Sequence, residues 1–87
     1  MKIKDGFILR EVAGNFIVVA VGEAAKKFNG VINLNETGAF MWRLLEKGCD
    51  KEGLKQAILN EYDVSEEIAD RDAEKFITKL TEAGLIK

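Results

Sequence analysis

One short segment, residues 31–42, does most to limit what this 87-residue chain can fold into. It begins with Val31, Ile32 and Leu34, residue types that favour a pleated and partly buried backbone. Asn35 follows at once, and its side-chain oxygen can accept a hydrogen bond from the first free N–H groups of a helix. The residues after it carry an apolar pattern with helical spacing. The sequence therefore predicts a strand that runs directly into a helix, so that a sheet lies against a helical core.

Two apolar runs near the N-terminus, residues 7–12 and 16–21, indicate a β-hairpin. Between them lie residues 13–15, where Gly14 and Asn15 tolerate the positive φ angles of a tight connection. The second run shows almost no polar alternation, so we expect it to be covered on both faces or to lie in the middle of a small sheet.

The connector after the hairpin spans residues 22–30. Its two alanines and two lysines could form a helical turn, but the flanking glycines and Asn29 favour a loop. This loop would return the chain for a third strand at residues 31–34. The predicted sheet is therefore three-stranded and antiparallel, with an exposed edge because an open sheet always has two.

Three helices are expected over residues 36–47, 51–61 and 66–83, each with one apolar stripe. Each is preceded by a side chain that can cap its first turn: Asn35, Asp50 and Ser65. Gly48 and Gly84 follow the first and third helices as left-handed stops. The prediction is one small α+β domain over residues 1–87, a winged-helix-like tri-helical unit with an N-terminal three-stranded antiparallel sheet.

Composition excludes several functional classes. The chain has 15 acidic and 13 basic residues, a net charge of −2, which gives no general attraction to nucleic acid or anionic membranes. It has no histidine and one cysteine, Cys49, so the usual soft metal ligands are missing and no metal, cofactor or catalytic residue is expected. The N-terminus lacks a secretory pattern, and the lone cysteine has no intrachain partner, which points to the cytoplasm.

The chain resembles the PqqD-like family, also called RiPP recognition elements, over nearly its whole length. Its most specific element is the leucine-asparagine-x-threonine pattern that begins at Leu34. The N-terminal hairpin adds to the likeness. The other residues that carry it are residues 34–45 with Gly48 after them, Tyr62 at the end of the second helix, residues 72–77 before Leu80, and residues 84–86.

This resemblance implies a non-catalytic domain that captures the leader of a ribosomally made precursor peptide and presents it to a modifying enzyme, often a radical S-adenosylmethionine protein. In the family the leader adds as an antiparallel strand to the edge of the third strand and packs into a groove beside the third helix. The corresponding residues here are Val31, Ile32, Asn33 and Leu34 on the edge, and Ile68, Asp72, Lys75, Phe76 and Lys79 on the helix. The opposite helix flank, with Asp70, Ile77 and Thr81, remains an alternative.

Other interpretations compete with these. A winged-helix DNA-binding regulator would read DNA with its third helix, but residues 65–87 hold six acidic and four basic residues. The exposed strand edge could also join two copies of the chain, so either a monomer or a homodimer is compatible with the sequence. Trp42 is expected to pack in or beside the core, and Cys49 to have a plain structural role.

Overall fold

The computed structural model describes residues 1–28 and 30–87. Its sheet consists of β1 (Phe7–Val12), β2 (Asn15–Ala20) and β3 (Ile32–Leu34), antiparallel and in the order β1-β2-β3. A short helix, α1 (Glu23–Lys27), links β2 to β3, and three longer helices follow: α2 (Glu36–Lys47), α3 (Lys51–Glu61) and α4 (Glu66–Glu82). The predicted α+β class with an N-terminal three-stranded antiparallel sheet is confirmed.

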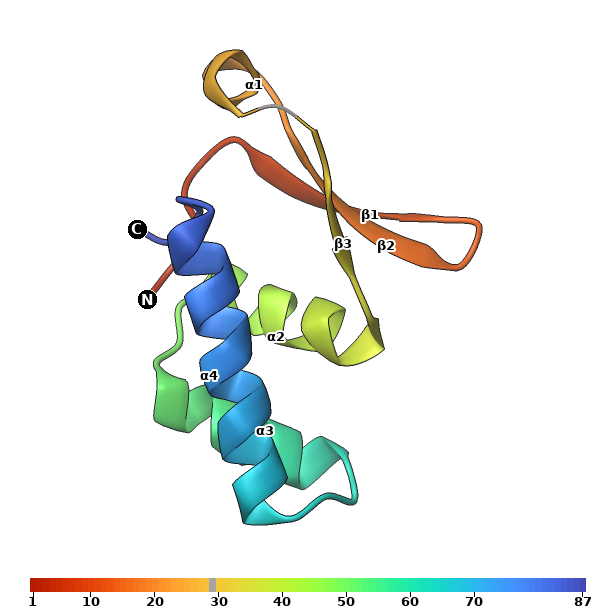
Figure 1. The fold of residues 1–87 in the computed structure, drawn as a ribbon, viewed down its shortest axis with the longest axis vertical. Helices are drawn as coiled ribbons and strands as arrows, with labels where there is room; N and C mark the ends of the chain where they lie inside the picture. Colours follow the sequence, from red (N-terminus) through yellow and green to blue (C-terminus); the bar gives the residue numbers. More distant parts are fainter. Residues whose placement is uncertain (29) are drawn as a thin grey trace.

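The helices form a layer against one face of the sheet (Figure 1). Helix α4 runs antiparallel to α3, to which it is joined by ion pairs, and α2 lies between these two helices and the sheet (Figure 1). Seven side chains at the centre are almost completely buried: Val18, Trp42, Leu45, Leu54, Ile58, Leu80 and Leu85. Trp42 thus packs in the core as expected, and its indole N–H has no hydrogen-bond partner among the described residues.

The two ends of the chain meet beside the C-terminal end of α4 (Figure 1). Ile3 and Ile86 form an isolated antiparallel bridge. The Lys4 N–H donates to the Leu85 carbonyl at 2.8 Å, and the Lys87 N–H donates to the Lys2 carbonyl at 2.8 Å. No helix in the described part of the chain is long and apolar enough to cross a membrane.

The connector differs from its prediction, because residues 23–27 form α1 rather than a loop. Its Glu23 carboxylate pairs with Lys26 at 3.2 Å, and the Phe28 ring that follows packs edge-on against Phe7, with centroids 5.4 Å apart. The ring contact joins the residue after α1 to a strand that is distant in sequence, and local sequence does not reveal it. Asn29, one of the residues on which the prediction of a loop was based, lies outside the described residues.

The hairpin turn is also displaced by one residue. Ala13 and Gly14 take the positive φ angles, 52° and 81°, which a two-residue type I′ turn requires at both central positions. Asn15 therefore belongs to β2, which spans residues 15–20 rather than 16–21. Strand β3 starts at Ile32, so Val31 precedes it, and α4 ends at Glu82, one residue earlier than predicted.

Candidate functional site

Strand β3 lies at an edge of the sheet, with β2 on one side only. Its register with β2 pairs Leu34 with Phe16, Asn33 with Ile17, and Ile32 with Val18. Ile32 and Leu34 are each 9% exposed and face the core, whereas the Asn33 side chain is exposed on the other face. The strand thus presents one backbone edge to its surroundings while its apolar side chains anchor it.

The hairpin turn determines which backbone groups of β3 point outward. A two-residue turn makes its flanking pair, Val12 and Asn15, a hydrogen-bonded pair, and the pairs along β1 and β2 then alternate. The N–H and C=O groups of Phe16 and Val18 consequently point to β3, where they meet those of Leu34 and Ile32. Asn33 lies between these two pairs, so its N–H and C=O point away from the sheet.

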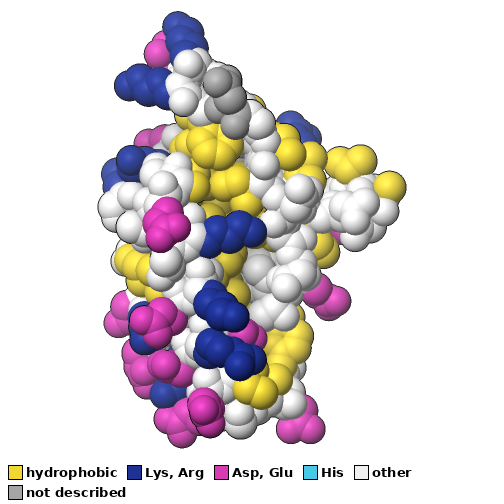
Figure 2. Space-filling view, in the orientation of Figure 1, with side chains coloured by type: hydrophobic (Ala, Val, Ile, Leu, Met, Phe, Trp, Pro, Cys, Tyr) yellow, Lys and Arg dark blue, Asp and Glu magenta, His cyan; other side chains and the backbone are white. Residues whose placement is uncertain are grey.

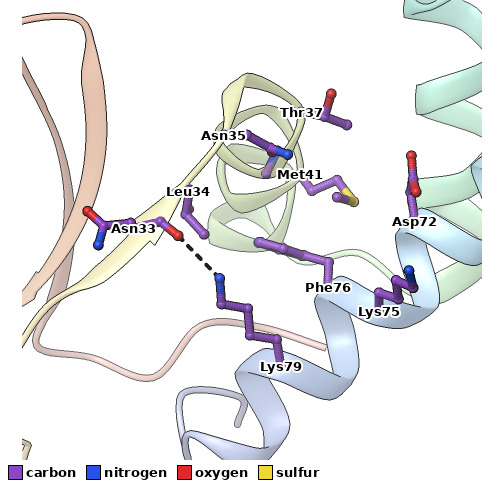
Figure 3. Close-up of a pocket in the computed structure, with 10 residues that line it drawn as sticks. Asn33, Leu34, Asn35, Thr37, Met41, Asp72, Lys75, Phe76 and Lys79 are labelled. Atoms are coloured by element: carbon purple, nitrogen blue, oxygen red, sulfur yellow. Dashed lines mark hydrogen bonds between the residues drawn. The ribbon is translucent and has the colours of Figure 1, made fainter.

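A groove of about 350 Å³ lies between β3, the start of α2 and the middle of α4 (Figure 3). Its floor is apolar, because Met41 and Phe76 lie there with only 3% and 6% of their surface exposed. The complete lining consists of Asn33, Leu34, Asn35, Thr37, Gly38, Met41, Asp72, Lys75, Phe76 and Lys79. Strand, cap and helix therefore build one surface although they are far apart in sequence.

Close packing at the β3–α2 junction shapes one wall of the groove. The Asn35 side-chain oxygen accepts a hydrogen bond from the Gly38 N–H at 2.7 Å and so caps α2. A Cβ on Gly38 would lie 3.1 Å from that oxygen and 3.3 Å from the Leu34 Cβ. The glycine thus lets the first turn of α2 approach the end of β3, and the cap marks where the strand ends and the helix begins.

Charged side chains from α4 stand over this apolar floor. The Lys79 ammonium donates a hydrogen bond to the outward-pointing Asn33 carbonyl at 3.2 Å (Figure 3). Asp72 lies at the other end of the groove, on the side of Thr37, and Lys75 lies between Asp72 and Lys79 (Figure 3). In the space-filling view, basic side chains follow one another along the middle of this face with apolar atoms beside them (Figure 2).

The opposite flank of α4 is engaged with α3. Lys51 lies 3.5 Å from both Asp70 and Glu74, and the Lys55 ammonium donates to Glu66 at 2.8 Å. That hydrogen bond, with the negative charge of Glu66, raises the pKa of Lys55 above its ordinary value. Of the residues on the alternative flank, Asp70, Ile77 and Thr81, none lines the groove.

Six of the nine residues assigned from the sequence line this groove: Asn33, Leu34, Asp72, Lys75, Phe76 and Lys79. Three do not. Val31 precedes β3 and is 53% exposed, Ile32 faces the core, and Ile68 is exposed on α4 outside the groove. The sequence reasoning missed Asn35, Thr37, Gly38 and Met41, which the predicted helix cap at a strand–helix junction could have indicated.

Comparison with known proteins bears on this geometry. The family described as Coenzyme PQQ synthesis protein D (PqqD) matches residues 8–86. Comparison with curated proteins gives no match. A structure of TbiB1 in complex with the TbiA(beta) leader peptide is 25% identical, with a TM-score of 0.78 over 100% of this chain and 95% of that one.

A second structure, lasso peptide synthetase B1 complexed with the leader peptide, is 20% identical, with a TM-score of 0.76 over 97% of this chain and 93% of that one. It shares the same fold. The extent of the family match, 79 of 87 residues (8–86), decides the assignment. The chain belongs to the PqqD family.

Proposed function

We propose that this protein is a non-catalytic adaptor that captures the leader of a ribosomally synthesised precursor peptide and presents it to a separate modifying enzyme. The observation that carries the proposal is the outward-pointing backbone of Asn33 beside a groove with an apolar floor. A peptide that pairs with β3 extends the sheet, and its alternate side chains point into the groove.

Both parts of the site are needed for useful affinity. A backbone hydrogen bond contributes about 1 kcal/mol net, whereas a micromolar complex needs about 8 kcal/mol after the costs of association. β3 is three residues long, so few such bonds can form. Burial of peptide side chains against Met41 and Phe76 must supply most of the remainder, since an apolar side chain gains about 1.5–3 kcal/mol on full burial.

The comparisons support this proposal. TbiB1 shares the fold over nearly its whole length, and its structure was solved in complex with a leader peptide. The PqqD family takes its name from a protein of coenzyme PQQ synthesis. The proposal also includes a cytoplasmic location, a winged-helix-like arrangement of α2 to α4, and a radical S-adenosylmethionine protein as the enzyme. The DNA-binding alternative gains no support, because α4 carries six acidic and three basic residues.

The test is an NMR titration of ¹⁵N-labelled protein with synthetic leaders of the precursor peptides encoded beside its gene. We expect the largest amide shifts at Asn33 and in the part of α4 from Asp72 to Lys79. Strand β1 provides the internal control, because it is the other edge of the same sheet. Shifts centred on β1 would contradict the assignment of the edge, and shifts with duplex DNA but with no leader would contradict the function.

A further inference from the structure

The hydrogen bond between Lys79 and Asn33 occupies the acceptor that an added strand needs. Asn33 is the residue of β3 whose backbone points outward, and its carbonyl already accepts from the Lys79 ammonium. The bond joins residues 46 positions apart, is 3.2 Å long and is exposed to solvent. A long, solvent-exposed hydrogen bond is weak, so a peptide can displace it.

Lys79 has no carboxylate partner in the described part of the chain. The ion pairs there involve Lys26, Lys51 and Lys55. Lys75, one turn before Lys79 on the same helix face, is likewise outside these pairs, and so is Arg71, one turn earlier. The groove itself is lined by Lys75 and Lys79 and by one carboxylate, Asp72, at its far end, whereas Arg71 lies outside the lining. The end of the groove beside Asn33 is therefore positively charged, in a protein whose net charge is −2.

We propose that Lys79 is a displaceable cap on β3 and determines peptide specificity: the peptide that binds carries a carboxylate that replaces the Asn33 carbonyl as the partner of Lys79. This inference rests on the proposed function. A strand added to β3 takes the Asn33 carbonyl for its own N–H and covers the groove. The displaced ammonium would then lose both its acceptor and part of its water, a cost that a nearby carboxylate removes.

The register places this carboxylate. Peptide side chains on either side of the residue paired with Asn33 point into the groove, opposite Ile32 and Leu34. Lys79 lies beside Asn33, whereas Leu34 adjoins the apolar floor formed by Met41 and Phe76 (Figure 3). In an antiparallel peptide the apolar anchor opposite Leu34 comes first, and the acidic residue opposite Ile32 follows two positions later.

The test uses a fluorescein-labelled synthetic leader of the precursor peptide encoded nearest to this gene. Each of its acidic residues is replaced singly by the matching amide, Asp→Asn or Glu→Gln. Binding is measured by fluorescence anisotropy with the wild type, Lys79→Gln, Lys79→Arg and the control Lys47→Gln. Lys47 ends α2 and is exposed, whereas the groove lies at the start of that helix.

In the leader, we expect one acidic residue that stands two positions after an apolar residue to matter for binding. Its replacement by the amide should weaken leader binding to the wild type and to Lys47→Gln about tenfold. It should leave binding to Lys79→Gln unchanged, and Lys79→Arg should retain the discrimination. Without peptide, Lys79→Gln should shift the Leu34 amide, whose peptide group contains the Asn33 carbonyl, more than the amides of β1.

Three results would overturn the proposal and leave the proposed function intact. The first is that a leader with no acidic residue binds the wild type, and the second is that every amide replacement weakens binding to the wild type and to Lys79→Gln equally. The third is that Lys79→Gln does not shift the Leu34 amide more than the amides of β1. Failure of the wild type to bind any leader would overturn both.

Discussion

Replacement of Asn33 by proline tests the assigned direction of the β3 backbone. Proline removes the N–H of residue 33, and in the register described above that N–H points away from β2. The substitution therefore removes no hydrogen bond of the sheet. Proline is tolerated on edge strands for this reason, so we expect the free energy of unfolding to fall by less than about 1 kcal/mol.

The effect of Asn33→Pro on peptide binding should be larger. A peptide paired with residue 33 loses one hydrogen bond, about 1 kcal/mol, and its own carbonyl is left without a partner, about 1 kcal/mol more. The sum of about 2 kcal/mol corresponds to a dissociation constant raised roughly 30-fold. Asn33→Ala, which keeps the backbone donor and alters only an exposed side chain, should bind like the wild type.

Two further variants complete the comparison. Ile32→Pro removes an N–H that bonds to β2 and should destabilise the fold by about 3 kcal/mol or more. Glu11→Pro introduces proline on the opposite edge, at a residue whose backbone also points outward, and should alter neither stability nor binding appreciably.

Urea unfolding can be followed by the fluorescence of Trp42, which is the single tryptophan and is fully buried. Peptide binding is followed by fluorescence anisotropy with the labelled leader. The assigned backbone direction is wrong if Asn33→Pro binds the leader like the wild type, or if it unfolds as readily as Ile32→Pro.

Three other substitutions follow from local geometry and can be measured by the same urea unfolding. Ala13→Asn should stabilise the protein by about 0.5–1 kcal/mol, because asparagine tolerates the positive φ of this turn position better than alanine; an unchanged midpoint would contradict this. Asn35→Ala should cost about 1 kcal/mol through loss of the α2 cap, whereas Asn35→Asp retains an oxygen acceptor and should cost little; equal losses would show that the cap is not the cause. Glu66→Gln removes the partner that raises the pKa of Lys55, so the stability difference from the wild type should be present below the ordinary pKa of 10.5 and should close as the pH rises through the raised value. A difference that persisted above the raised pKa of Lys55 would indicate another cause.

Local signals predicted most of the fold. Asn35, Asp50 and Ser65 each accept a hydrogen bond from the N–H three residues later, and α2, α3 and α4 begin directly after them. A cap depends on neighbours in sequence, so the sequence alone reveals it. Helix α1 was missed because the flanking glycines favour a loop, whereas the residue that ends the helix, Phe28, packs against Phe7 of β1, a contact between separate elements.

The candidate site could be predicted only in part for the same reason. Helical periodicity placed Asp72, Lys75 and Lys79 on one flank of α4 but did not decide which flank meets β3. In the structure the other flank pairs with Lys51 and Lys55 of α3, and helical periodicity does not reveal such contacts between separate helices. The missing wall, the first turn of α2, follows from the close approach permitted by Gly38, which is also a three-dimensional property.

The paired ends of the chain have a consequence for how this domain can be joined to a partner. Because the first and last residues are held against each other by the Ile3–Ile86 bridge, a polypeptide attached to either end leaves the surface at the same place. An enzyme fused to the N-terminus and one fused to the C-terminus would therefore start at the same distance from the groove. Either order of the two domains in a fusion protein should allow the enzyme to act on a peptide bound in the groove. The same closure permits circular permutation, with new ends at the exposed tip of the hairpin at Ala13 and Gly14.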